Sequence, residues 1–139
     1  MQPVTFLDVR AGVVQALEQA FPEMQIYGEE NKEGFATPCF FVKLLEPTHS
    51  QELNRRYLRV LPFEVLYYTE TDSERIAMAE QLAGVLETIR VNDRPLIGTN
   101  MSWKVEEEVL HFFVTYRMHV WKQQPDDPLM QTLQKELKA

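Results

Sequence analysis

The chain has 139 residues, enough for one domain with a sizeable hydrophobic core. Hydrophobic residues make up 45% and charged residues 25%, and the formal net charge of −7 argues against a dominant phosphate-binding surface. The single cysteine cannot form an internal disulfide, and we expect neither a signal peptide nor a membrane-spanning segment. These features indicate a cytoplasmic protein, or one assembled in the cytoplasm.

The N-terminal part predicts a helix followed by a strand. Residues 5–21 carry apolar side chains at helical spacing behind a capping-box-like pair, Thr5 and Asp8, and Pro22 ends the helix. Residues 38–45 then form an apolar run in which both alternating faces are hydrophobic. We therefore expect this strand to be covered on both faces.

The middle of the chain predicts a second strand and a second helix. Residues 55–68 read as a long strand with Pro62 at an edge or a bulge. Residues 72–90 read as a helix that begins with a capping box between Thr71 and Glu74. Its expected buried stripe consists of Ile76, Ala79, Leu82, Ala83, Leu86 and Ile89.

Two further strands follow, because residues 99–107 and 109–121 both alternate between apolar and polar side chains. In the first of them, Thr99, Met101, Trp103 and Val105 are expected to face inward. Glu106 to Glu108 form the turn of the resulting hairpin, without the Asn-Gly pair that favours such turns.

This order of elements predicts an α+β fold in a single domain. We expect a mainly antiparallel four-stranded sheet with two main helices packed on it and a short C-terminal helix. The domain would span residues 1–122, and residues 123–139 would form a C-terminal tail in which Leu129, Thr132, Leu133 and Glu136 suggest the short helix.

Metal-dependent and nucleophilic chemistry have weak support in the sequence. His111 and His119 share a strand face but lie about 26 Å apart, and Cys39 has no second cysteine to form a metal-binding pair. Glu29, Glu30 and Glu33 crowd a turn and could gather around a hard cation, but we expect them to form a solvated acidic turn. We expect no cofactor, and we keep a metal-dependent hydrolase as an alternative.

The stretch NRRYLR places Arg55, Arg56 and Arg59 around Tyr57, a pattern that can follow a phosphate backbone. The same arginines can instead meet carboxylates, on their own chain or on another subunit. We expect the second arrangement, and we predict a contact between subunits in which Arg55, Arg56 and Arg59 meet Glu106, Glu107 and Glu108.

Two aromatic residues extend this candidate interface. Phe113 and Trp121 fall on the otherwise polar face of the last strand, among Thr115, Arg117 and His119. Exposed aromatic side chains in a polar setting favour a protein–protein interface over a monomer surface.

The order of segments resembles a family of phage and prophage tail terminator, or tail-completion, proteins from Gram-positive hosts. The resemblance rests on IYGEENKEGFATPCFFVKLL, ELNRRYLRVLPFEVLYY, the helix that begins TDSERIAMAEQLAGVLE and the closing strand VLHFFVTYRMHVWK. It covers residues 7 to 122, and it carries no catalytic residue to transfer.

The resemblance implies a structural virion protein. Such a protein assembles as a ring, commonly a hexamer, on the head-proximal end of the tail tube, where it ends tube polymerisation and prepares head–tail joining. It implies three partners: other copies of the chain, the major tail tube protein and a head-completion protein. DNA would pass through without specific binding, and neither a membrane nor a small-molecule substrate is expected. A head–tail connector or stopper of the neck is the alternative within the same class.

Overall fold

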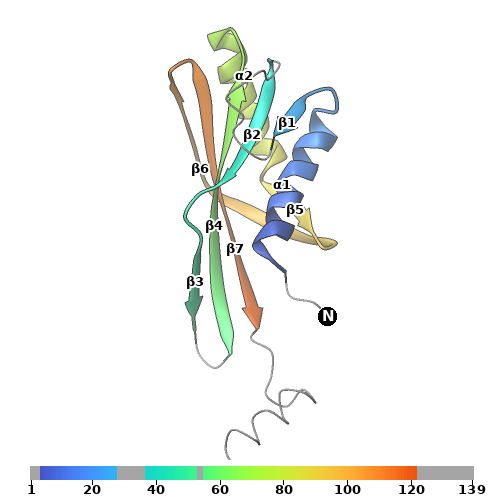
Figure 1. Cartoon of the computed structure of the whole chain (residues 1–139), viewed down its shortest axis with the longest axis vertical. Coiled ribbons are helices and arrows are strands. Elements are labelled where there is room, and N and C mark those ends of the chain that lie inside the picture. Colours follow the sequence, from blue (N-terminus) through green and yellow to red (C-terminus); the bar gives the residue numbers. More distant parts are fainter. Residues whose placement is uncertain (1–3, 28–36, 53–54, 122–139) are drawn as a thin grey trace, which may run out of the picture.

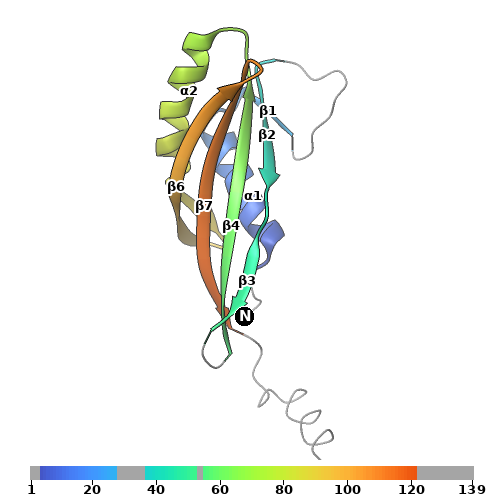
Figure 2. The ribbon, with the colours of Figure 1, turned by 90° about the vertical axis from the view of Figure 1, so that its left-hand side faces the viewer.

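A computed structural model describes residues 4–27, 37–52 and 55–121. Its elements in chain order are α1 (Phe6–Ala20), β1 (Gln25–Tyr27), β2 (Cys39–Leu44), β3 (Thr48–Gln51), β4 (Arg56–Tyr68), α2 (Asp72–Val85), β5 (Thr88–Val91), β6 (Arg94–Glu106) and β7 (Val109–Trp121). Figure 1 shows α1 on one side of a long, curled sheet, and Figure 2 looks onto the opposite side, with α1 behind the strands and α2 beside β6.

The sheet differs from the expected one in size and in strand direction. It has seven strands in the order β1-β2-β4-β7-β6-β5, with β3 paired to β4 alongside β2. The β1 and β2 strands run parallel, whereas the other pairs are antiparallel. The α+β class is confirmed, but the four-stranded antiparallel sheet is wrong. The expected C-terminal helix lies outside the described residues.

The helices begin where the sequence predicts. Thr5 and Asp8 form a complete capping box at the start of α1, with the Asp8 backbone N–H donating to Thr5 Oγ1 at 3.0 Å. A hydrogen bond from the Thr5 backbone N–H holds the pKa of Asp8 below its usual value. The α2 helix begins behind Thr71, whose side chain accepts from the Glu74 backbone N–H.

The second helix is shorter than expected. It ends at Val85, and the next residues form β5, which pairs with β6 through a tight turn at Asn92 and Asp93. Its buried face also differs, because Arg75 is buried while Ile76 is 46% exposed. The guanidinium of Arg75 donates to the Thr69 carbonyl at 3.1 Å and lies 3.6 Å from the Asp72 carboxylate, which partly compensates its buried charge.

One main core lies between the helices and the sheet. The α1 helix contributes Val9, Val13 and Leu17, and the other buried members come from β2, β4, α2, β5 and β7. A second, smaller cluster of Cys39, Phe41 and Leu66 lies on the opposite face. Because Phe40 and Phe41 point to different clusters, the prediction that β2 is covered on both faces is confirmed.

Pro62 lies in the central strand β4, between the segment that pairs with β2 and the segment that pairs with β3. The β2 strand pairs with β4 up to Phe63, and β3 takes over from Val60, so Pro62 stands where one neighbour ends and the other begins. Its carbonyl accepts from the Leu45 backbone N–H at 2.8 Å, on that same side. Since the N–H and C=O of a strand residue point the same way, the missing proline donor falls in this gap.

Candidate assembly interface

One end of the sheet carries a compact basic cluster where β3, β4 and β7 come together. Arg56 donates to Glu52 at 2.8 Å, and His119 lies 3.2 Å from the same carboxylate oxygen. Trp121, which pairs with Arg56 across β4 and β7, is 63% exposed. We call Arg56, His119 and Trp121 the basic end, with Glu52 as the internal partner of the first two. Its arginine meets a carboxylate of its own chain, as the alternative to nucleic-acid binding predicts.

Arg59 has a structural role beside the basic end. Its Nε donates to His49 at 3.0 Å, and one terminal nitrogen donates to the Val4 carbonyl at 2.8 Å. Its guanidinium also lies 4.7 Å from the centre of the Phe6 ring. Arg59 therefore ties the start of α1 to the sheet through contacts within its own chain.

The opposite end carries three glutamates in and beside the β6–β7 turn. Glu106 pairs with Val109, so Glu107 and Glu108 form a two-residue turn, and the predicted hairpin is confirmed. Both turn residues have positive φ angles, 53° and 64°, a left-handed conformation that glutamate adopts at a cost. We call Glu106 to Glu108 the acidic turn.

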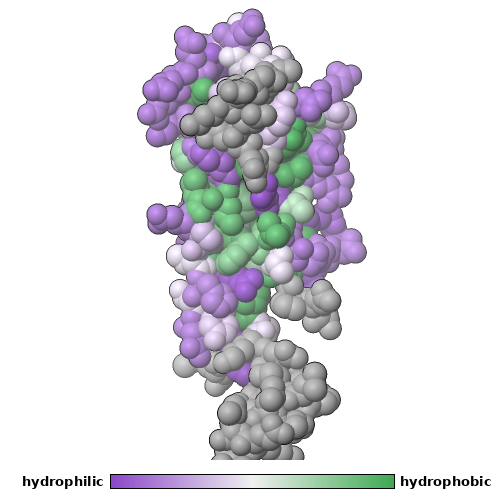
Figure 3. Space-filling view, viewed as in Figure 1, coloured by the Kyte–Doolittle hydropathy of each residue, from purple (hydrophilic) through white to green (hydrophobic). Residues whose placement is uncertain are grey.

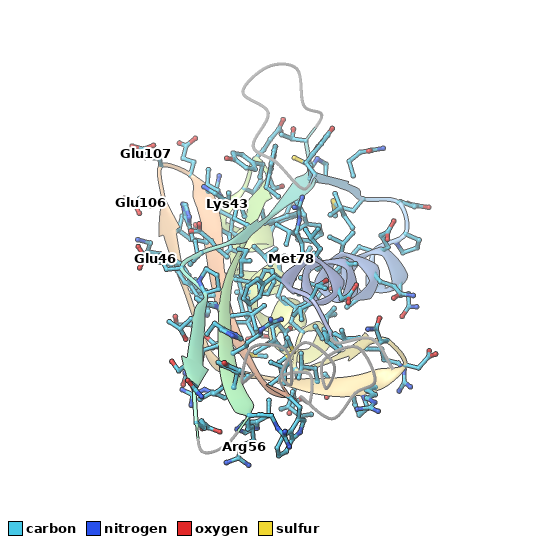
Figure 4. All side chains as sticks on the ribbon, turned by 60° about the horizontal axis from the view of Figure 1, so that its bottom comes forward. Lys43, Glu46, Arg56, Met78, Glu106 and Glu107 are labelled. Carbon is cyan, nitrogen blue, oxygen red and sulfur yellow. The ribbon has the colours of Figure 1, made fainter. Side chains whose placement is uncertain are left out.

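Lys104 is the basic residue next to the acidic turn. Its ammonium lies 3.0 Å from Glu106, and the hydrogen bond from Lys104 holds the pKa of Glu106 below its usual value. Figure 4 shows Glu106 and Glu107 pointing away from the rest of the molecule. The acidic turn is exposed, and Lys104 favours the ionised form of Glu106.

The two ends cannot meet within one subunit. Arg56 pairs with Trp121 and Tyr68 pairs with Val109, so twelve residues of strand separate the ends, a distance of about 40 Å. Figure 4 shows Arg56 far from Glu106 and Glu107 across the length of the sheet. Any pairing of the basic end with the acidic turn therefore joins two different copies of the chain.

Between the two ends, neither helix of the described residues covers the face of the sheet opposite α1 (Figure 2); this face, which we call the open sheet face, is partly apolar. His111 Nδ1 lies 2.7 Å from Glu64 Oε2, diagonally across β7 and β4, and the two side chains are only 20% and 12% exposed. Phe113 lies opposite Glu64 and is half-buried, with the Lys104 ammonium 6.0 Å from its ring centre. The structure therefore places Phe113 on the same face as Trp121, as predicted, and joins it to a row of ionisable groups.

The structure tests the metal hypothesis only in part. Within residues 4–27, 37–52 and 55–121, no three His, Cys, Asp or Glu side chains are grouped closely enough to hold a metal ion. Glu29, Glu30 and Glu33 lie outside these residues. Cys39 is buried, and burial raises the pKa of its thiol. In the described part of the chain, neither helix is long and apolar enough to cross a membrane.

Alternation did not reveal how far some apolar residues are exposed. Trp103 and Val105 occupy the helix-facing side of β6, as expected, but remain 46% and 39% exposed because they lie near the end of the hairpin. The polar strand β3 escaped prediction because none of its four residues is apolar. The feature that could have indicated β3 is the length of β4, which exceeds that of β2 and so leaves part of β4 for another strand to pair with.

These features define a small α+β domain whose distinctive surfaces are a basic end, an acidic turn and a partly apolar sheet face. The profile of the phage tail terminator protein family matches residues 8–128. The chain belongs to this family and is a structural protein of a phage tail. The expected Gram-positive host stays a prediction.

The comparison with curated proteins gave no match. Among solved structures, 23 chains match, and one of them is 13% identical, covers 88% of this chain and 99% of its own length, and has a TM-score of 0.42.

Proposed function

We propose that the protein closes into a homo-oligomeric ring, expected to be a hexamer, on the head-proximal end of the tail tube. The ring ends tube polymerisation and prepares the tail for joining to the head. Membership of the tail terminator family supports a role in the tail, and the arrangement of charge on the sheet supports the ring.

The observation that carries the proposal is the separation of opposite charges on one rigid sheet. The basic end and the acidic turn lie about 40 Å apart, at the two ends of β4 and β7. Each end can therefore meet the opposite end of a neighbouring copy, and we propose that this contact is heterologous rather than two-fold symmetric. Heterologous contacts form a closed ring when the rotation between copies completes a circle.

The open sheet face adds apolar area to this contact. Phe113 is half-buried and Trp121 is exposed, and both lie on this face. Aromatic side chains are enriched at the centres of protein interfaces, while charged pairs at the rim set orientation and partner choice. We infer that the aromatic residues contribute affinity and that the charged ends set the register between copies.

The two axial faces of such a ring meet different partners. One receives the last ring of the major tail tube protein, and the other presents a surface to the head-completion protein. DNA passes through the opening without specific binding, which the net charge of −7 favours because it disfavours attachment to phosphates. In this proposal the ring is assembled in the host cytoplasm and remains in the virion tail.

Two measurements test the proposal. Light scattering across micromolar concentrations gives the mass of the assembly, and purified tail tubes incubated with the protein show whether elongation stops at one end. A ring-sized mass or capped tubes supports the proposal. A strict monomer that also leaves tubes uncapped overturns it, and immunogold labelling on separated heads instead of tails assigns the protein to the neck.

A further inference from the structure

His119 and Arg56 share one carboxylate oxygen at the basic end. Arg56 Nε donates to Glu52 Oε1 at 2.8 Å, and His119 Nε2 lies 3.2 Å from the same atom. The side chains of His119, Arg56 and Glu52 are 49%, 43% and 30% exposed. Because a single carboxylate balances only one positive charge, the net charge of this group depends on whether the imidazole is protonated.

Paired strands bring these three side chains together. His119 lies opposite Leu58 on β4, and Arg56 is two residues before Leu58, so both point to the open sheet face. Glu52 directly follows β3, and its backbone N–H donates to the Arg56 carbonyl at 2.7 Å. Figure 3 shows hydrophilic residues gathered around β3, at this end of the sheet. The group is therefore held in register by the sheet, although its side chains reach solvent.

The other elements add little charge beside the imidazole. On β7, Arg117 is exposed on the same face, two positions before His119. The β3 strand presents the neutral Ser50 to this face and directs His49 to the other one. Neither helix of the described residues covers the face. Among the described residues, Glu52 is thus the carboxylate that faces His119, and an arginine already binds it.

Protonation of the imidazole changes the charge of the basic end. Histidine gains its second ring proton between about pH 5 and 8, a range in which glutamate and arginine side chains keep their charges. With a neutral imidazole, the charges of Arg56 and Glu52 cancel, whereas a protonated imidazole leaves a positive charge in excess. The acidic turn stays negative over the same range, and Lys104 favours the ionised form of Glu106. Mild acid therefore adds charge at one end and removes none from the other.

We propose that His119 makes assembly of the ring sensitive to pH, because its protonation supplies charge with which the basic end meets the acidic turn of the next copy. This inference rests on the ring contact proposed above and adds its regulation. Association then takes up a proton, so mildly acidic solution favours it and mildly basic solution opposes it. Below about pH 5, the glutamates of the acidic turn begin to gain protons, and association weakens again.

Self-association at about pH 8 and about pH 6 tests the proposal. The measured quantities are the dissociation constant from light scattering and the protein concentration that caps half of the purified tail tubes. Both should fall about threefold at the lower pH, the size of effect that exposed charge pairs produce. His119→Gln keeps a donor for Glu52 but gains no charge, so its values should differ little between the two pH values. His119→Lys is charged at both and should associate more tightly than the parent at about pH 8.

The other two histidines of the chain are the matched controls. His49 accepts from Arg59, and His111 lies beside Glu64, so neither belongs to the basic end. His49→Gln and His111→Gln should each retain most of the threefold difference between the two pH values. Because each removes one titrating imidazole, as His119→Gln does, they separate a local effect from an effect of total charge.

The outcomes distinguish this regulation from the ring itself. A parent chain that associates equally at both pH values overturns the role of His119, and so does His119→Gln with the pH dependence of the parent. The ring stands in either case. A chain that stays monomeric and leaves tail tubes uncapped at both pH values overturns the ring, and this regulation with it.

Discussion

Arg56 and Glu106 lie at opposite ends of the same sheet, and each is already paired with a residue of its own end. Arg56 donates to Glu52 at 2.8 Å, and Glu106 accepts from Lys104 at 3.0 Å. The side chains of Arg56 and Glu106 are nevertheless 43% and 59% exposed. A neighbouring copy can therefore extend each local pair into a network of charges, in which orientation is better defined than in an isolated surface pair.

Charge reversal tests the contact between the two ends. Arg55→Glu with Arg56→Glu, or Glu107→Lys with Glu108→Lys, should each weaken self-association by about tenfold or more, because like charges then face each other. Combining all four substitutions should restore most of the association. Light scattering as a function of concentration gives the dissociation constant for each variant.

The control for this series is Glu80→Lys, which changes charge on the exposed side of α2, away from both ends. It should leave association nearly unchanged. If the two reversed pairs weaken association and the combined variant fails to recover, the two ends do not contact each other in the assembly.

The proposed role of the acidic turn in assembly should come at a cost to the stability of the subunit. Glu107 and Glu108 have φ angles of 53° and 64°, nearly the same as Asn92 and Asp93 at 51° and 64°. Asn and Gly suit this conformation, so Glu107→Asn with Glu108→Gly should raise the free energy of unfolding by about 1–2 kcal/mol. The same change removes two carboxylates from the proposed interface, so association should weaken while stability rises. Urea unfolding and light scattering measure the two effects.

The second turn of the chain provides the matched comparison. Asn92→Glu with Asp93→Glu should lower stability, because it places glutamates where favoured residues now stand. A Glu107→Asn/Glu108→Gly variant that is stabilised and assembles normally would show that these carboxylates are dispensable for assembly.

Local patterns predicted the elements whose partners are next to them in the chain. The β7 strand has the predicted bounds, Val109–Trp121, because its even-numbered side chains from Leu110 to Met118 face one core and the hairpin partner β6 immediately precedes it. The start of α1 is likewise fixed locally, by the Thr5 and Asp8 capping box.

Packing against residues distant in the sequence explains what the sequence did not predict. Ile89 continues the helical spacing of Leu82 and Leu86, yet it belongs to β5, because β5 packs against α1 and buries Ile89 in the same core as Val13. The Asn92–Asp93 turn was the available signal for this hairpin. Contact between distant residues thus decided the structure over local propensity.

The candidate interface was predicted in composition but not in detail. That Arg56 meets Glu52, and that Arg59 binds the start of α1, depends on the register of β3 against β4 and on the position of Val4. The β4 strand extends beyond the end of β2, and β3 pairs with this extension. The four polar residues of β3 carry no apolar pattern from which this pairing could be predicted.

Two helix-start carboxylates should make stability depend on acid pH. The pKa of Asp8 is lowered by its hydrogen bond from the Thr5 backbone, and that of Glu74 by hydrogen bonds from the hydroxyls of Thr69 and Thr71. Groups with a lowered pKa in the folded state stabilise it above their unfolded pKa, and this contribution is lost as pH falls through the folded value. The free energy of unfolding should therefore decline below about pH 4.

Asp8→Asn with Glu74→Gln removes both carboxylates and tests this origin. The double variant should be less stable than the parent at neutral pH, and the difference should shrink as pH falls towards about 3. Urea unfolding at a series of pH values measures it. A difference that stays constant with pH would show that ionisation of these two groups does not contribute.

The strongest effect on stability is expected where β6 crosses the core. A methyl group on Gly98 would lie 2.6 Å from the Leu86 carbonyl oxygen and 2.7 Å from Val114 Cγ2, and the backbone oxygen cannot move aside freely. That carbonyl also accepts the hydroxyl of buried Tyr116 at 2.7 Å. Gly98→Ala should therefore lower the free energy of unfolding by at least about 2 kcal/mol, and Tyr116→Phe by about 1–2 kcal/mol.

Gly84→Ala is the matched control for the effect of a methyl group itself. Gly84 is exposed within α2, and nothing lies within 4 Å of the added carbon. Because alanine favours the helix, this substitution should raise stability by about 0.5–1 kcal/mol. Opposite signs for the two glycine substitutions, measured by urea unfolding, are the expected result. A Gly98→Ala variant as stable as the parent would mean that β6 can move away from Leu86 at little cost, and that the joint between β5, β6 and β7 is less rigid than the contacts around Tyr116 indicate.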